Sequence, residues 1–399
     1  MEKIADPDRV ASLKQMLIAR EASRASGHES APVVIEAAIP PDAALPRDNE
    51  ILERVAVAIE TCPPPAEAKA RAKLALARAA LYTHAGTALD KLAQGSAALS
   101  PDEAGALEAI IIADGTRPSF LLTDGKPDLE DPLLGQWADL VGAHYPAMRT
   151  IARAVGRIQP SNGNASHYIG TGTLIDAGAM LVLTNYHVIH DARNKFAVAM
   201  EQDERSIRVT GTLEIDFVGE AANSATNRFR IVSVDLPVGY GAGSDGIDAA
   251  VAHVEPIGTA STLPSSVPRL SRDIAYANGG MTSLATIGFP GPPPQSQGLA
   301  GDVDWGYVTG TLFRNQFGFK RLAPGRFTGG LSPANGARRV ISHDATTFGG
   351  ASGSLVVAWA DAHAPAFGLH FAGATGRRNH ALSFAAAAAA LQAVGVHFD

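Results

Sequence analysis

The spacing of hydrophobic residues along the chain changes near residue 157. Before that point apolar residues recur at helical intervals, as in Leu52, Val55 and Ile59, and the run from Ala66 to Gln94 contains few helix breakers. After it, short apolar runs are separated by Gly, Pro, Asn and Ser, which is typical of β-strands joined by turns. The pattern therefore predicts a helical N-terminal region over 1–155 and a β-rich domain over 156–399.

One stretch of the N-terminal region does not fit a continuous helix. Prolines at 32, 40, 41 and 46 interrupt residues 27–47, and each removes a helical hydrogen bond and clashes with the preceding turn. We expect this segment to be a linker or an extended strap. Nearer the second domain, the pattern predicts a short strand over 117–122 and a helix from Leu133 to about Ala154.

The candidate strands of the second domain are short and closely spaced. They cover residues 167–175, 179–185, 206–218, 229–237, 248–255, 282–289, 305–313, 339–344, 353–360 and 364–373. Strands of this length with turn residues between them favour an all-β barrel or sandwich. An Ala-rich segment at 383–395 predicts a C-terminal helix, so the whole chain is expected to be an α+β multidomain protein.

Charge and composition narrow the classes of function. The 399 residues include 33 Lys and Arg against 40 Asp and Glu, a net charge of −7, without the basic surface that nucleic-acid binding requires. The single cysteine, Cys62, excludes an intrachain disulfide and a Cys-based zinc cluster. The N-terminus lacks a signal-peptide pattern, and no apolar span of membrane-crossing length follows. We expect a protein of a reducing cytoplasm, with neither membrane nor nucleic acid as a partner.

Three residues of the β-rich domain, His187, Asp248 and Ser352, form a candidate nucleophilic triad. A serine hydroxyl attacks a carbonyl at neutral pH only when an imidazole removes its proton, and a carboxylate is needed to orient that imidazole. Gly350 and Gly353 allow the tight turn that aims successive amides at a developing oxyanion. We expect the amides of Gly350 and Ser352 to be the donors.

These residues also have plainer interpretations. A histidine at the end of an apolar strand is often a core residue, and a Gly-Ala-Ser-Gly-Ser sequence is often only a turn. Other carboxylates that could serve as the acid are Asp216, Asp235, Asp245 and Asp344. No HExxH pattern and no cysteine accompany His190 or His253, so we expect no metal site and no cofactor, and we expect His343 to be a strand or turn residue.

The order His, Asp, Ser in an all-β context is the chymotrypsin order and differs from the subtilisin and α/β-hydrolase orders. The chain resembles the chymotrypsin-like (trypsin-like) serine peptidases, closest to the bacterial glutamyl endopeptidase and HtrA-like groups. The matching segments are GTGTLI (170–175), LTNYHV (183–188), IDAAVAHVE (247–255), ATIGFPG (285–291), HDATTFGGASGSLV (343–356) and GLHFAG (368–373). The resemblance implies a chymotrypsin-like double β-barrel over 156–399. It favours Asp248, because the family places an apolar run directly after the acid.

The same resemblance implies a specificity pocket made by Thr346, Thr347, Gly368, Leu369 and His370. Thr346 stands where enzymes specific for Lys or Arg carry an aspartate, which argues against basic substrates. His370 with Thr347 resembles the His and Thr of the glutamyl endopeptidases, and an imidazole N–H with a hydroxyl can donate to a carboxylate or an amide oxygen. We expect cleavage after Glu, with Gln or Asp as further substrates. The alternative interpretation is that His370 only packs in the hydrophobic core and does not contact the substrate.

Together these features predict a cytoplasmic serine endopeptidase that acts on protein or peptide substrates. The rival hypothesis is a catalytically silent barrel that binds an extended peptide along the strand at 368–373. The N-terminal half carries no catalytic motif, and it could simply cover the barrel. We predict instead that it regulates or targets the peptidase through a protein partner, because every candidate site residue follows residue 186.

Overall fold

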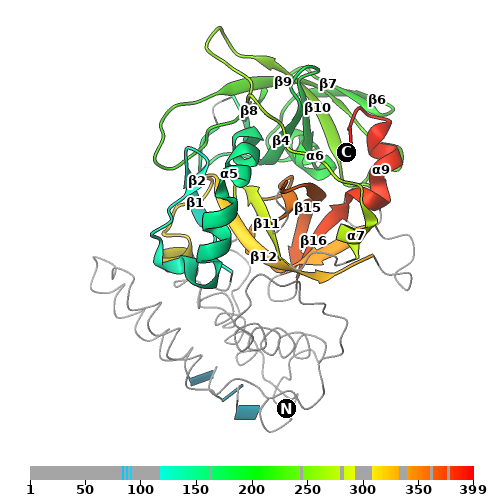
Figure 1. The fold of residues 1–399 in the computed structure, drawn as a ribbon. Helices are drawn as coiled ribbons and strands as arrows, with labels where there is room; N and C mark the ends of the chain where they lie inside the picture. The colour runs from blue at the N-terminus through cyan, green and yellow to red at the C-terminus, as the bar shows by residue number, and fades with distance from the viewer. Residues whose placement is uncertain are drawn as a thin grey trace, which may run out of the picture.

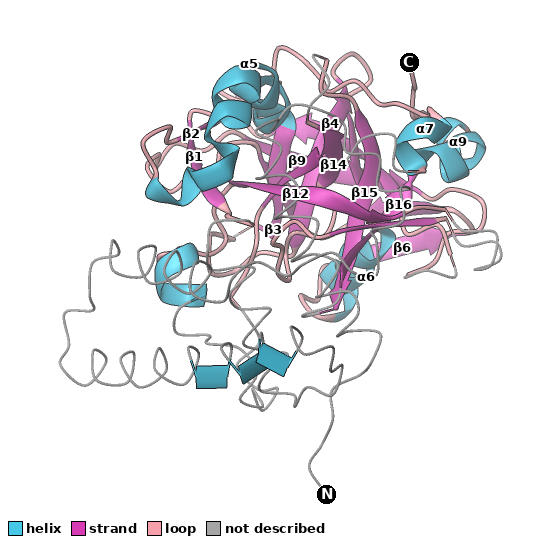
Figure 2. Cartoon of the chain, turned by 60° about the horizontal axis from the view of Figure 1, so that its bottom comes forward, coloured by secondary structure: helices cyan, strands magenta, loops and turns pink. Residues whose placement is uncertain are grey.

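The computed structural model describes residues 83–84, 87–88, 90–91, 117–161, 163–242, 246–278, 283–292, 308–331, 339–359, 363–374 and 378–399. From residue 117 onward these form two antiparallel barrels with a few short helices at their edges (Figures 1 and 2). The predicted linker at 27–47 lies outside the described residues. So do the helices predicted before residue 117, apart from the helical residues 83–84, 87–88 and 90–91.

The first barrel has six strands and closes where β9 pairs with β10. Its strands are β3 (Val155–Pro160), β4 (Gly170–Asp176), β5 (Leu181–Thr184), β8 (Leu213–Asp216), β9 (Arg228–Asp235) and β10 (Ala250–Pro256). A hairpin of β6 (Met200–Asp203) and β7 (Ser206–Val209) extends β9, and helix α6 (Tyr186–Asn194) follows β5. Alternate side chains such as Leu174, Val182, Ile215 and Ile231 are fully buried in its interior, as the period of two along a strand requires.

The second barrel also has six strands and closes where β11 pairs with β12. Its strands are β11 (Ser283–Gly288), β12 (Arg321–Gly329), β13 (Val340–His343), β14 (Leu355–Ala358), β15 (Ala366–Ala374) and β16 (Arg378–Ser383). Helices α7 (Ile274–Ala277) and α9 (Phe384–Gln392) lie beside each other at one side of it (Figure 2). The double barrel and the C-terminal helix agree with the sequence-based expectation.

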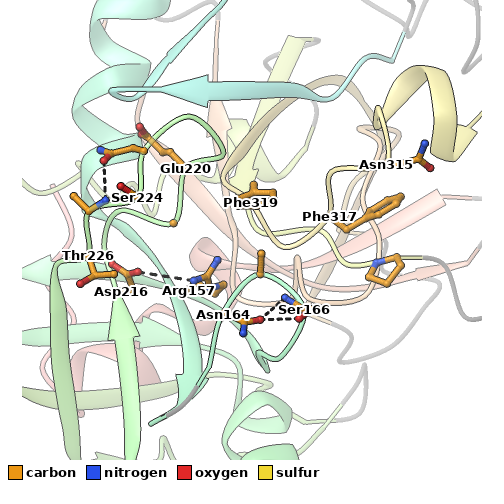
Figure 3. A pocket seen from close by; sticks show the side chains of 15 residues that line it. Arg157, Asn164, Ser166, Asp216, Glu220, Ser224, Thr226, Asn315, Phe317 and Phe319 are labelled. Atoms are coloured by element: carbon orange, nitrogen blue, oxygen red, sulfur yellow. Dashed lines mark hydrogen bonds and ion pairs between the residues drawn. The ribbon is translucent and has the colours of Figure 1, made fainter. Parts of the chain in front are cut away.

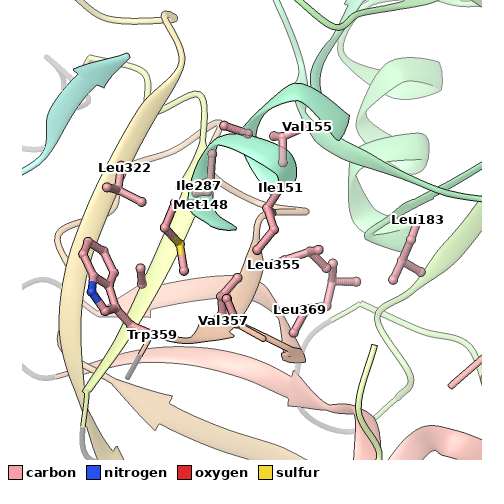
Figure 4. Packing of buried hydrophobic residues seen from close by; sticks show 14 of the residues in the cluster. Met148, Ile151, Val155, Leu183, Ile287, Leu322, Leu355, Val357, Trp359 and Leu369 are labelled. Carbon is pink, nitrogen blue, oxygen red and sulfur yellow. The ribbon is translucent and has the colours of Figure 1, made fainter. Parts of the chain in front are cut away.

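The two barrels share part of their hydrophobic core. Leu183 of β5 belongs to the same buried cluster as Leu355 and Leu369 of the second barrel (Figure 4). Met148 and Ile151, which precede β3, point into this cluster beside Ile287 and Val357 (Figure 4). Apolar packing therefore forms part of the contact between the two barrels.

Two strand predictions need correction. Residues 206–218 form two strands, β7 and β8, instead of one, because the chain turns between them where Gly211 N bonds to Ala199 O. Residues 305–313 were expected to be a strand, but Val308–Leu312 forms a π-helical turn. Asn315 N donates to Thr309 O at 2.7 Å within this turn, although Val and Thr favour strands.

The segment before the barrels packs onto them. It comprises β1 (Phe120–Thr123), β2 (Lys126–Pro127), the 3₁₀ helix η1 (Pro132–Trp137) and α5 (Ala138–Ala154), in agreement with the predicted strand and helix. Strand β1 pairs with β12, and the buried Lys320 amine donates to Ala152 O and Phe217 O. Burial lowers the pKa of Lys320 to about 8. A domain boundary at 155/156 stays a prediction, but within the described residues packing is continuous across it.

Candidate active site

The ends of β5 and β10 bring His187 and Asp248 together. These strands pair with Thr184 opposite Ala250, so α6 starts beside the loop that carries Asp248. Asp248 Oδ2 lies 2.7 Å from His187 Nδ1, and its Oδ1 accepts the backbone N–H of His187 at 3.0 Å. The carboxylate is 1% exposed. Because an ionised carboxylate only accepts hydrogen bonds, Nδ1 carries the proton and Nε2 is left as the basic nitrogen.

The other candidate acids are engaged elsewhere. In the described part of the chain their partners are Arg157 for Asp216 at 3.9 Å, His253 for Asp235 at 2.9 Å and Arg117 for Asp344. Asp245 lies outside the described residues. Of the carboxylates that the structure describes, Asp248 is therefore the one that orients His187.

Ser352 lies in a tight loop between two glycines with positive φ. Gly350 has φ +92° and Gly353 φ +93°, and a Cβ on Gly353 would come within 1.9 Å of Thr171 O. Residues other than glycine adopt such positive φ angles only with strain, so positions 350 and 353 favour glycine. The Ser352 hydroxyl lies 3.4 Å from Phe371 O and makes no hydrogen bond to His187 within the described residues. Such bonds are often loose before substrate binds, and rotation about the Ser352 Cα–Cβ bond redirects the hydroxyl.

The amides of Gly350 and Ser352 were expected to face an oxyanion. Neither donates to any group in the part of the chain that the structure describes. These two N–H groups, separated by Ala351, are available for a negatively charged oxygen.

The expected pocket residues divide into two groups. The hydroxyl of Thr346 donates to Arg117 O at 2.7 Å, and Leu369 is fully buried in the hydrophobic core, so neither side chain is available to a substrate. Thr347 is half-buried, and Gly368 lies in β15 opposite Val356. His370 adjoins the nucleophile loop, because Gly353 N bonds to His370 O at 2.9 Å.

His370 belongs to a buried histidine cluster. Its Nδ1 lies 3.3 Å from His343 Nε2, and a third member, His380, has its Nδ1 3.2 Å from Ser342 Oγ. Burial lowers the pKa of His370 well below its usual value, and the nearby His343 and His187 lower it further. Burial likewise lowers the pKa of His343 to about 3. Both rings are therefore neutral at neutral pH. His380 has no local signal in the sequence, because only the pairing of β13 and β15 with β16 brings it near His343 and His370.

Comparison with known proteins identifies the family to which this chain belongs. The model of the trypsin-like peptidase domain matches residues 170–363, a range that contains all three triad candidates. A protein of Lysobacter enzymogenes named "probable serine protease" is 54% identical over 325 residues, which cover 81% of this chain and 84% of that protein. The chain belongs to the trypsin-like serine peptidases. It is a serine endopeptidase, and its substrates are proteins or peptides.

A cavity of the peptidase is lined by residues other than the triad candidates. This cavity of about 650 Å³ lies between β3, the loop after β8 and residues 315–319 (Figure 3). Its charged groups are paired internally: Arg157 donates to Gly318 O at 2.8 Å, and Glu220 accepts the amides of Asp124 and Gly125. The cavity contains none of the candidate catalytic residues.

Metal and membrane sites were not expected. Among the described residues of the peptidase, no group of three or more His, Cys, Asp or Glu side chains is arranged to hold a metal ion. None of the described helices has the length and apolar character needed to cross a membrane.

Proposed function

We propose that His187, Asp248 and Ser352 are the catalytic triad of this endopeptidase. The observation that carries the proposal is the 2.7 Å contact between His187 Nδ1 and the buried Asp248 carboxylate. It sets the tautomer in which Nε2 accepts a proton and stabilises the imidazolium that results. Ser352, on the adjoining loop, is the nucleophile.

The mechanism follows from these positions. Ser352 Oγ attacks the scissile carbonyl carbon while its proton passes to His187 Nε2, and the carbonyl oxygen becomes an oxyanion bound by the amides of Gly350 and Ser352. The C–N bond then breaks, and the imidazolium returns its proton to the leaving amine. Water, activated by the same imidazole, attacks the acyl-enzyme, releases the carboxylate product and restores the serine.

We also propose cleavage after Glu, with Gln or Asp as further substrates. Support comes from His370, which is neutral, adjoins the nucleophile loop and is held by His343 through Nδ1. That contact leaves recognition to Nε2, whose N–H would donate to a carboxylate or amide oxygen of the substrate. Thr347 would supply a second donor, since the Thr346 hydroxyl is already bonded to Arg117 O. None of the five expected pocket residues is an aspartate that could pair with a Lys or Arg side chain of the substrate.

The N-terminal region is proposed to regulate or target the enzyme, with a protein as partner. All triad residues follow residue 186, but Arg117, which precedes the barrels, bonds to Thr346 and Asp344 beside the expected pocket. Through this contact the N-terminal region touches Thr346, one of the residues expected to form the specificity pocket. Cytoplasmic location rests on the sequence alone and is tested by fractionating cells that express the protein.

One experiment tests triad and specificity together. Wild type, Ser352→Ala, His187→Ala and Asp248→Asn are incubated with a denatured proteome, and cleavage sites are mapped by mass spectrometry. We expect Glu to be the most frequent residue immediately before the cleaved bond. Ser352→Ala and His187→Ala should be inactive, and Asp248→Asn should lose about 10⁴-fold in kcat. A near-normal rate for Asp248→Asn would assign the acid elsewhere. Dominance of Arg, or an unchanged preference in His370→Ala, would refute the pocket assignment.

A further inference from the structure

The carbonyl groups of the nucleophile loop are each held by a named partner. Gly349 O accepts Gly291 N at 2.6 Å, and Ala351 O accepts Ser354 N at 3.0 Å and Ser354 Oγ at 2.6 Å. The N–H and C=O of a planar trans peptide point in opposite directions, so fixing these two oxygens fixes the directions of the Gly350 and Ser352 amides. These are the two amides proposed to bind the oxyanion.

The peptide between those two is held from the other barrel. Thr171 of β4 donates its hydroxyl to Gly350 O at 2.9 Å, and its backbone N–H donates to Ser352 O at 2.9 Å. The same hydroxyl accepts Phe289 N at 3.1 Å. One fully buried side chain therefore connects β4, the segment after β11 and the nucleophile loop.

Thr171 is itself fixed in place. Its carbonyl accepts the hydroxyl of Thr184 at 2.7 Å, and the side chains of both threonines are fully buried. Buried hydrogen bonds of this kind have no competing water, so loss of one leaves its partner unsatisfied instead of hydrated. Gly350 O would then lose its partner, and rotation of the Gly350–Ala351 peptide would change the Gly350 ψ and Ala351 φ angles that set the Gly350 and Ser352 amides relative to each other.

We propose that Thr171 is a positioning residue of the oxyanion hole: its hydroxyl holds the Gly350–Ala351 peptide and thereby the angle between the Gly350 and Ser352 amides that face the scissile carbonyl oxygen. The assignment rests on the proposed triad and oxyanion donors. Thr171 does not touch the substrate and acts through Gly350. Its contribution belongs to the transition state, because the charge that the amides bind develops only there.

Two substitutions in the same strand separate this role from ordinary packing. Thr171→Val keeps the shape of the side chain but cannot donate to Gly350 O or accept from Phe289 N. Thr173→Val is the matched control, because Thr173 is also fully buried in β4 and its hydroxyl has no hydrogen-bond partner within the described residues. Thr171→Ser restores the hydroxyl and should restore the function.

The experiment measures kcat and KM of the full-length chain on a peptide that wild type cleaves, together with the affinities of two inhibitors. One is the matching peptide aldehyde, whose adduct with Ser352 carries the oxyanion, and the other is the cleavage product, which carries none. For Thr171→Val we expect kcat and aldehyde affinity to fall together by about 10- to 100-fold, since loss of one oxyanion donor costs about 10²- to 10³-fold. KM and product affinity should remain unchanged, and Thr173→Val and Thr171→Ser should resemble wild type.

Equal kcat in Thr171→Val and Thr173→Val would overturn the assignment, as would a loss confined to KM or to the melting temperature. If the valine variant does not fold at the assay temperature, Thr171→Cys decides, because a thiol is a weaker donor of similar size and should give a smaller loss with the same pattern. A wild-type chain that neither cleaves the peptide nor reacts with a phosphonate at Ser352 would overturn the proposed triad and this assignment with it.

Discussion

His343 and His370 remain uncharged inside the second barrel, which makes them a source of acid sensitivity. Burial lowers the pKa of both, so in the folded protein they take up a proton only at a pH well below the value of about 6.5 at which an unfolded histidine does. As pH falls through 6.5 the unfolded chain therefore binds protons first. The stability that these residues contribute is complete above pH 6.5 and is lost progressively toward pH 3.

We predict that His343→Gln reduces this sensitivity. Glutamine does not titrate, and its amide can still bond to His370 Nδ1. Between pH 7 and pH 5 the free energy of unfolding should fall by about 2 kcal/mol less in the variant than in wild type. Urea unfolding at the two pH values measures the difference. Equal losses in the two proteins would mean that His343 is already charged in the folded state.

At the level of elements, the N-terminal segment is joined to the second barrel by a buried ion pair. Arg117 pairs with Asp344, with side chains only 9% and 12% exposed, and Asp344 also accepts Arg326 N at 2.6 Å. The guanidinium lies over the Trp137 ring at 5.8 Å. A charge removed from such a pair leaves its partner buried without compensation.

We predict that Arg117→Gln lowers the free energy of unfolding by about 3 kcal/mol and raises KM for peptides with Glu before the cut, with kcat unchanged. The reason is that Asp344, in the segment that leads to Thr346 and Thr347, loses its ion-pair partner, while the triad is untouched. Arg149→Gln is the control: its pair with the exposed Asp124 should contribute no more than about 1 kcal/mol. Denaturant unfolding and steady-state kinetics of both variants provide the comparison. A larger loss in Arg149→Gln would contradict the argument.

The elements that sequence reasoning identified are those with a local signal. Alternating apolar runs marked most strands, and the His187 and Ser352 motifs are contiguous in sequence. Thr171, Arg117 and His380 carry no such signal. The hydroxyl of Thr171 contacts a residue 179 positions away, and Arg117 contacts one 227 positions away, so each becomes meaningful only once the strands are paired. The helical turn at 308–312 also lacks a local signal, because its Val and Thr residues favour a strand.

At the scale of the whole molecule, the two barrels and the segment before them form a single packed unit. Strand β1 adds to the second barrel beside β12, and Trp359 of that barrel donates to Leu140 O of α5 at 3.3 Å. The proposed acid and base, Asp248 and His187, come from the first barrel, and the proposed nucleophile, Ser352, comes from the second. Any force that moves one barrel against the other therefore changes the distance between base and nucleophile.

This packing determines where the N-terminal region can be removed. A chain that starts at Ala147 lacks β1, β2 and half of α5. It also loses the buried residues Phe120, Leu122, Trp137 and Val141, which leaves the part of the hydrophobic core that they cover exposed to solvent. We predict that it aggregates. A chain that starts at residue 115 keeps these elements and Arg117, so it should fold and melt close to the full-length protein. If the removed region restrains the enzyme, the shortened chain should cleave a small peptide faster than the full-length chain. Equal rates would leave targeting as the role, whereas a folded but inactive 115–399 chain would show that residues before 115 complete the active site.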